Sequence, residues 1–260
     1  MLSLPLPWPS DDVISFLVEK SSGQFVFAAT VIRFVNEDRK VPSAQLQLVL
    51  DIYESLDVSQ QKTNPFALLD EIYSHVLRSC DEIDTVLSVL GLFFFLDGRA
   101  LTPDFLESFV DTNITFLFWG LHSIIHVPAS GTDTIMFYHA SFGDYLMDHH
   151  RSKDFHIDEH PVQSFLLKSC MRQLCKAPDS AFATMSPALE YSRKSWSNHY
   201  IRGDSLKMGS LDPILENFKS LFCQSSNLKS KTISLDLLYW GSIYGPVWIK
   251  IHHQVGIYFV

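Results

Sequence analysis

The chain has few of the residues from which nucleotide-binding loops are built. Its 260 residues include only 11 glycines, and these are scattered singly, so neither a G-x-x-x-x-G-K-[ST] loop nor a G-x-G-x-x-G loop occurs. The sequence also lacks the G-x-S-x-G, H-E-x-x-H and paired C-x-x-C motifs of hydrolases and zinc proteins. These absences predict a chain that is not a self-sufficient enzyme, and we expect no cofactor and no bound metal.

Disulfide and membrane signals are equally scarce. The first ten residues contain three prolines and no basic side chain, unlike a secretory signal. The stretch 233–260 is the best candidate for a membrane span, but acidic, basic and proline residues interrupt it. The sequence has four widely separated cysteines, Cys80, Cys170, Cys175 and Cys223. We therefore expect a cytoplasmic chain with reduced thiols and no membrane partner.

Positive charge is scarce in the middle of the chain. The formal net charge is −9, and residues 61–160 carry 5 basic against 15 acidic side chains. Residues 1–60 carry a net −4, and residues 161–260 a net +5 without a dense Lys/Arg cluster. Because an acidic surface repels a phosphate backbone, this distribution predicts no nucleic-acid partner.

Apolar residues and helix-start signals are abundant. Hydrophobic residues make up 47% of the chain, enough for a substantial core. Ser10 precedes two aspartates, and four further capping residues stand directly before prolines: Asn64, Thr102, Ser186 and Asp212. Apolar residues at helical spacing follow these signals. The pattern predicts a mainly α fold with helices over 13–32 (interrupted at Ser22-Gly23), 66–77, 83–96, 102–109, 113–124, 162–175, 187–201 and 213–223.

Residues 64–150 follow the order of a winged helix–turn–helix. The helices after Thr102 form the predicted helix–turn–helix pair, and strands near 124–127 and 135–138 form the wing. Ser141 to Met147 closes the domain as a helix, with Ser141 and Asp144 spaced as a capping box. The predicted domains are 1–60 (end of a helical subdomain and linker), 61–150 (winged helix), 151–230 (helical extension) and 231–260 (atypical tail).

The junction around His139 is the most informative segment. A predicted strand delivers this histidine to the start of a capped helix, where backbone N–H groups favour an anion. Two readings stay open: His139 either donates a hydrogen bond to a phosphate oxygen or is a half-buried histidine that ties strand to helix. A hydrolytic triad of His139, Ser141 and Asp144 is a third reading, although triad members usually come from separated segments.

Two further clusters have less specific spacing. Four histidines lie close together among acidic residues, at positions 149, 150, 156 and 160, and imidazole with carboxylate suits zinc. Their spacing fits no known ligand pattern, and the segment is more typical of a polar loop. Cys170 and Cys175 do not share one helix face well, which favours packing in a core.

Six segments appear in an order that resembles a known family. They read FLVEKSSGQFVFAATVIRFV, NPFALLDEIYSHVL, LTPDFLESFV, LHSIIHVP, FYHASFGDYLMDHHRSKDFHID and ALEYSRKSWSNHY. Together they cover about residues 10–220 and resemble the region after the nucleotide-binding core in fungal NACHT proteins. These are signal-transducing NTPases of the STAND class, related to NOD-like receptors.

The resemblance implies a regulatory function. In that family a helical subdomain and a winged helix close over the nucleotide core, and a histidine at the strand–helix junction contacts the β-phosphate of ADP. His139 matches this histidine by position, so the resemblance implies a phosphate sensor wherever a nucleotide core is supplied. The family's Walker motifs are missing from this chain, which implies a truncated, non-catalytic arm whose partner is a NACHT core or a homologous chain.

A winged-helix nucleic-acid-binding module is the alternative. Its recognition helix would be 113–124, which contains no Lys or Arg. The segment instead carries three aromatic residues, Phe116, Phe118 and Trp119, and we expect them to form an exposed apolar patch.

Overall fold

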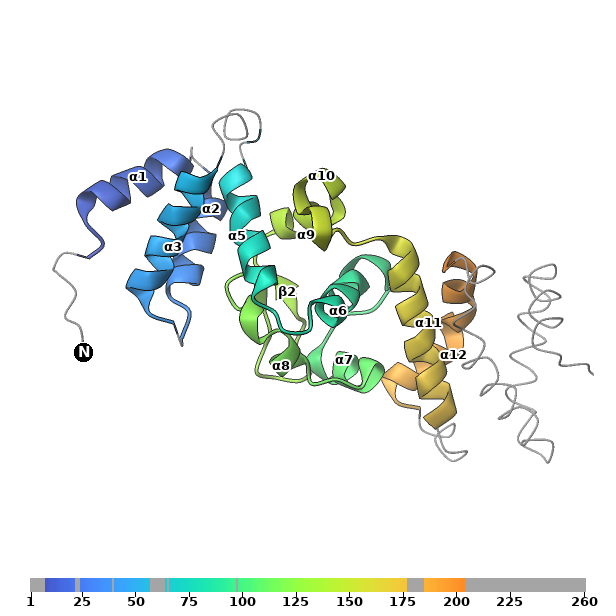
Figure 1. The fold of residues 1–260 in the computed structure, drawn as a ribbon. Helices are drawn as coiled ribbons and strands as arrows, with labels where there is room; N and C mark the ends of the chain where they lie inside the picture. The colour runs from blue at the N-terminus through green and yellow to red at the C-terminus, as the bar shows by residue number, and fades with distance from the viewer. Residues whose placement is uncertain are drawn as a thin grey trace, which may run out of the picture. The chain divides into compact units, whose positions relative to one another are not determined.

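The computed structural model describes residues 8–21, 24–38, 40–56, 64, 66–96, 98–176 and 185–203. The described chain is mostly helical with one small two-stranded antiparallel sheet (Figure 1), which confirms the predicted fold class. Within these residues, no helix combines the length and the apolar composition that crossing a bilayer requires. The predicted helix at 213–223 and the apolar stretch at 233–260 lie outside the described residues.

The chain divides into two compact units. The first unit comprises the described residues within Met1–Leu87 and Asn113–Ile157, and the second those within Ser88–Thr112 and Asp158–Val260. The first unit contains α1 (Asp11–Ser21), α2 (Phe25–Val35), α3 (Pro42–Ser55), α5 (Ala67–Arg78), the start of α6 (Ile83–Phe95), α8 (Ile114–Leu117), η1 (Trp119–Leu121), β1 (Ile125–His126), β2 (Met136–Phe137), α9 (Ala140–Met147), α10 (His149–Ser152) and η2 (Lys153–Phe155). The second contains the rest of α6, α7 (Pro103–Val110), α11 (Glu159–Lys176) and α12 (Pro187–Arg202). The domain boundaries drawn from the sequence stay predictions.

Most helix starts lie where the sequence places them. Thr102 Oγ1 accepts a hydrogen bond from Phe105 N at 3.2 Å, and Ser186 Oγ accepts one from Leu189 N at 3.2 Å. These side chains satisfy N–H groups that have no partner within the helix, which confirms both predicted caps.

Two predicted helix boundaries are wrong. Helix α5 begins at Ala67 after an N-cap at Phe66, because the Asn64 side chain is used differently: its Oδ1 accepts from Phe66 N at 2.9 Å. The predicted helix 113–124 is a single turn, α8, followed by the 3₁₀ turn η1, which contains Gly120. Glycine lowers helix stability, and Leu121 N bonds back three residues, to Phe118 O, as in a 3₁₀ turn.

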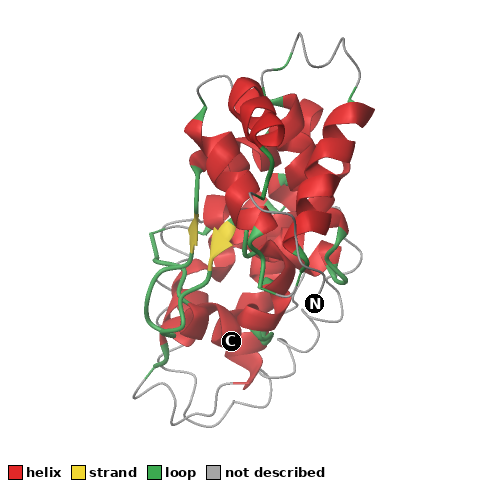
Figure 2. Cartoon of the chain, turned by 90° about the vertical axis from the view of Figure 1, so that its left-hand side faces the viewer, coloured by secondary structure: helices red, strands yellow, loops and turns green. Residues whose placement is uncertain are grey.

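The predicted hairpin is present but short. Ile125 pairs with Phe137, and His126 with Met136, in an antiparallel ladder (Figure 2). Ile124 and Ile125 are buried, and the Phe137 ring meets Phe142 of α9 edge-on at 5.3 Å. The hairpin therefore leads the chain directly into α9.

Helices α11 and α12 pack along each other in the second unit, and both contact α7. Helix α6 has one glycine in its buried part, Gly91. A Cβ atom added there would lie 2.3 Å from Cγ2 of Val162 on α11, which is far inside van der Waals contact. Glycine thus allows the Val162 side chain to lie directly against the backbone of α6.

We predict that Gly91→Ala lowers the free energy of unfolding by about 1–3 kcal/mol, measured by urea denaturation. Alanine favours a helix by about 1 kcal/mol over glycine, but the overlap with Val162 outweighs this gain. The added change Val162→Ala should restore part of the loss. Gly120→Ala is the matched control, since its Cβ would meet Ser79 Oγ at an ordinary 3.6 Å. A Gly91→Ala variant as stable as the wild type would contradict this packing.

Candidate functional site

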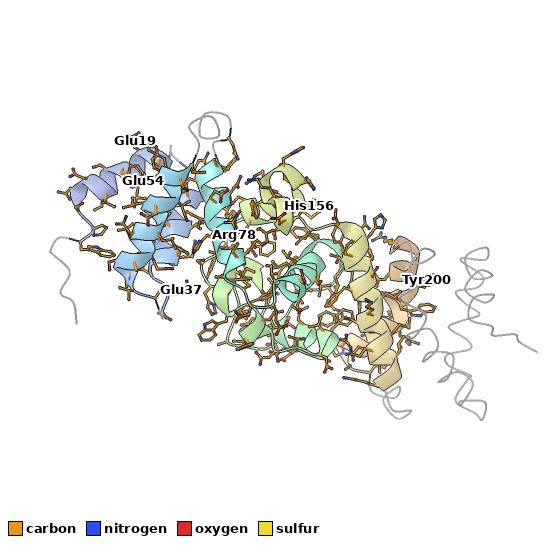
Figure 3. The ribbon with its side chains drawn as sticks, viewed as in Figure 1. Glu19, Glu37, Glu54, Arg78, His156 and Tyr200 are labelled. Carbon is orange, nitrogen blue, oxygen red and sulfur yellow. The ribbon has the colours of Figure 1, made fainter. Side chains whose placement is uncertain are left out.

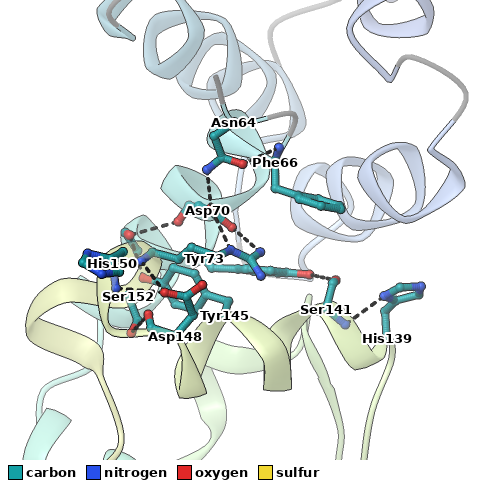
Figure 4. Close-up of polar contacts among 12 residues, drawn as sticks. Asn64, Phe66, Asp70, Tyr73, His139, Ser141, Tyr145, Asp148, His150 and Ser152 are labelled. Atoms are coloured by element: carbon teal, nitrogen blue, oxygen red, sulfur yellow. Dashed lines mark hydrogen bonds and ion pairs between the residues drawn. The ribbon is translucent and has the colours of Figure 1, made fainter. Parts of the chain in front are cut away.

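His139 forms the N-cap of α9 in an extended backbone conformation. Its Nδ1 accepts a hydrogen bond from Ser141 N at 3.0 Å (Figure 4). Since an accepting ring nitrogen carries no proton, the proton of the neutral imidazole lies on Nε2. The His139 side chain is exposed, so this Nε2–H group is available as a donor beside the N-terminus of α9.

Tyr73 of α5 connects this helix to the start of α9. Its hydroxyl lies 2.9 Å from Ser141 Oγ. Both residues are buried. The phenol thus ties α5 to the first turn of α9.

A second buried phenol lies one turn along α9. Tyr145 Oη lies 2.8 Å from Ser74 Oγ, and the rings of Tyr145 and Tyr73 are 5.4 Å apart. Burial raises the pKa of both phenols, that of Tyr145 to about 12. Both hydroxyls therefore stay protonated and act as hydrogen-bonding groups in the core.

A buried ion pair holds α10 against α5. Arg151 donates to both carboxylate oxygens of Asp70, from Nη2 at 2.7 Å and from Nε at 3.1 Å. Asn64 Nδ2 donates to the same carboxylate at 3.0 Å (Figure 4), and the Arg151 guanidinium lies over the Phe66 ring at 5.1 Å. The Asp70 carboxylate raises the pKa of the Arg151 guanidinium, and the two side chains are only 7% and 18% exposed. Because the pair is bidentate, it fixes both the orientation of the Arg151 guanidinium and its distance from the Asp70 carboxylate.

The predicted capping box of Ser141 and Asp144 is wrong. Helix α9 begins one residue earlier, so His139 is the cap, and Ser141 is a buried residue inside the first turn. The hydrolytic triad does not assemble either. Ser141 Oγ pairs with Tyr73, and His139 Nδ1 accepts from the Ser141 amide, while Asp144 is exposed one turn further along the helix.

The histidine cluster divides between the two units. His149 stacks edge-on against His150 at 6.1 Å and against His156 at 5.2 Å in the first unit. His160 belongs to the second unit, where its Nδ1 lies 3.1 Å from the carbonyl oxygen of Arg202. Across the described residues, no three His, Cys, Asp or Glu side chains converge as they would around a metal ion.

Cys170 is buried and Cys80 is half-buried, while the side chain of Cys175 lies outside the described part of the structure. Cys170 is fully buried, and burial raises the pKa of its thiol to about 12 and that of Cys80 to about 11. Both sulfurs therefore stay protonated at neutral pH and are poor nucleophiles. For Cys170 this matches the expected role in a core.

The prediction of an exposed patch of three aromatic residues is only partly correct. Phe116 is 73% exposed and Trp119 40%, but Phe118 is fully buried because the chain turns between α8 and η1. Sequence spacing alone could not show this, since a helix and a 3₁₀ turn place the same residues on different faces.

Some residues of the site were not foreseen from the sequence. The Arg151 guanidinium reaches Asp70 across 81 positions, and Arg33 lies over the Tyr138 ring at 4.0 Å. Helix α10 was expected as a loop, although Asp148, whose Oδ1 accepts from His150 N at 2.9 Å, was a readable cap signal. Helix α3 was also missed, despite Pro42 at its first position.

We predict that Arg151→Met costs about 3 kcal/mol of unfolding free energy, measured by urea denaturation, because it leaves the Asp70 carboxylate buried without its cation. The double variant Asp70→Asn/Arg151→Met should be more stable than the single one. The matched control is Lys194→Met, which breaks an exposed pair with Glu190 and should cause no measurable loss. Equal losses in the single and double variants would contradict this prediction, because the unpaired Asp70 carboxylate would then not be the cause of the loss.

The Tyr145 phenol should make stability fall in alkali. Between pH 10 and 12 the unfolded phenol releases its proton while the folded one keeps it, so the unfolded state is favoured as the pH rises. We expect the wild type to lose about 1 kcal/mol more than Tyr145→Phe between pH 9 and pH 11. Chemical denaturation at several pH values measures this, and parallel curves for the two proteins would contradict the raised pKa.

Comparisons with protein-family models, with curated proteins and with solved structures each give no match. The exposed imidazole of His139 at the start of α9 accepts from the Ser141 amide, and the Ser141 side chain is paired with the Tyr73 hydroxyl. In the same unit, the Asp70–Arg151 pair holds α10 against α5.

Proposed function

We propose that the chain is a non-catalytic regulatory arm of a NACHT-type STAND signalling NTPase, acting in the cytoplasm of a fungal cell. The observation that carries the proposal is the anchored His139 ring. Its Nδ1 is occupied by the Ser141 amide, which leaves Nε2–H as an exposed donor at a helix N-terminus. This is the arrangement that a sensor of a phosphate oxygen needs.

The arm would act as a latch on a nucleotide-binding core. With ADP bound to that core, His139 donates to the β-phosphate, and this contact favours the closed state. Exchange for ATP removes the contact and releases the arm for assembly, because a ligand shifts a conformational equilibrium only through its different affinity for the two states. The protein partner is the core itself, in the same polypeptide or in a homologous chain.

The rival functions have less support. A hydrolase centred on Ser141 lacks an assembled base, since the histidine beside it bonds to the amide and not to the hydroxyl. A nucleic-acid-binding winged helix would need a recognition helix, and α8 is a single turn in a segment without Lys or Arg. A latch requires neither feature.

The test is nucleotide retention in a reconstituted complex. The chain is co-expressed with a fungal NACHT nucleotide-binding core, purified, and the bound ADP per complex is measured by chromatography. We expect the wild-type complex to retain ADP and the His139→Asn complex to lose it at least ten times faster. Asparagine is a good N-cap, so α9 keeps its start while the imidazole donor is lost.

His150→Asn is the matched control, because His150 is an exposed histidine at the start of α10 and should leave ADP retention unchanged. Two results would refute the latch: ADP retention that does not depend on His139, or hydrolysis of ATP by the chain without any core.

A further inference from the structure

A hydrogen-bond network crosses the contact between α11 and α12 in the second unit. His199 Nε2 lies 2.7 Å from the Tyr191 hydroxyl, and His199 Nδ1 lies 2.7 Å from Gln163 Oε1. Gln163 Nε2 donates onward to the Glu159 carboxylate at 3.2 Å. The first three side chains are no more than 5% exposed, whereas Glu159 lies at the surface. We call these four residues the His199 network.

The Glu159 carboxylate fixes the direction of the bonds in this network. An ionised carboxylate only accepts, so the amide nitrogen of Gln163 faces it and the amide oxygen faces His199. Because an amide oxygen also only accepts, the proton of the neutral imidazole lies on Nδ1. The other ring nitrogen, Nε2, then accepts from the Tyr191 hydroxyl. Neutral His199 therefore has one tautomer, with both ring nitrogens bonded.

A second proton on the His199 ring would disrupt the network. A protonated imidazole has only donors, so Nε2 could no longer accept from the Tyr191 hydroxyl. The new charge would also lie among buried side chains, where it is much less stable than in water. The rings of Phe105 and Phe109 on α7 meet the Tyr191 ring edge-on at 6.1 and 5.5 Å, so α7 adds an apolar surface.

The ionisable groups near the ring give such a charge little compensation. Glu159 is separated from His199 by a whole side chain. Arg202 lies one turn beyond His199, and His160 Nδ1 lies 3.1 Å from the Arg202 carbonyl oxygen. Tyr200, labelled in Figure 3, is buried, which raises the pKa of its phenol and keeps it neutral. Other charged side chains of these helices have partners of their own: Glu190 with Arg99 and Lys194, Arg172 with the Val110 carbonyl oxygen, and Lys176 with Asp111.

We infer that the His199 network is a pH-sensitive lock between α11 and α12. The lock is closed while His199 is neutral, and uptake of a proton by His199 opens the helix pair. In the open state the ring meets water, where histidine takes up a proton at about pH 6.5. Since the open state then binds more protons than the closed one, the helix pair loses stability as the pH falls below about 6.5. The lock does not involve His139, so it is independent of the proposed function.

The test is hydrogen exchange of the full chain between about pH 7.5 and 5.5, read by mass spectrometry on peptides from α11 and α12. After correction for the intrinsic pH dependence of amide exchange, the equilibrium constant for opening should rise up to about tenfold over the pH unit below 6.5, because one proton is taken up. His199→Gln should remove most of this rise. A glutamine can accept from Tyr191 and donate to Gln163, but its amide does not take up a proton.

His160→Gln is the matched control, because His160 is an exposed histidine on the same pair of helices. This variant should keep the rise that the wild type shows. The inference would be overturned if the rise persisted in His199→Gln, or if His160→Gln abolished it.

A second measurement does not depend on the folding of any variant. Nitrogen NMR of the imidazoles in the wild-type chain reports which ring nitrogen carries a proton. We expect His199 to hold a proton on Nδ1 alone throughout the range in which a histidine in water becomes charged, about pH 7.5 to 6. A folded His199 that gains its second proton near pH 6.5, or that carries its single proton on Nε2, would contradict the lock.

Discussion

The first unit depends on one buried charge, the Asp70 carboxylate. A carboxylate that is removed from water must be compensated, and here Arg151 and Asn64 provide three hydrogen bonds to it. Asn64 precedes α5, Asp70 lies in the first turn of α5, and Arg151 belongs to α10. The carboxylate therefore fixes the segment entering α5 and the segment leaving α9 at one point. One turn along α5 from Asp70, Tyr73 bonds to Ser141 of α9, and Ser74 bonds to the Tyr145 hydroxyl of the same helix.

Local signals predicted much of the fold. The caps at Thr102 and Ser186, the buried pattern of α6 and the alternating strands of the hairpin each depend on residues within a few positions of one another. The errors arose where a side chain has two possible uses. Asn64 was taken as a cap but is held by Asp70 and Phe66, and Ser141 was taken as a cap but is buried under Tyr73. Tertiary contacts decided both cases.

The candidate site was predictable only in part. A histidine between a strand and a capped helix stands out in the sequence, and His139 does lie at that junction. That its own Nδ1 caps the helix could not be read from spacing, because serine and aspartate are the usual caps and both occur nearby. Arg33 is more than one hundred positions from Tyr138, and no local pattern connects the two residues.

The close approach at Gly91 has a mechanical consequence for the second unit. Helices that touch through long, flexible side chains can slide past each other by small steps, which is how many proteins accommodate shear. Here the Val162 methyl groups fill the space above the only glycine in α6, and a shift along the axis by one residue would bring them against a side chain. The contact at Gly91 accordingly favours one register of α6 against α11, and it resists sliding of the two helices at this point.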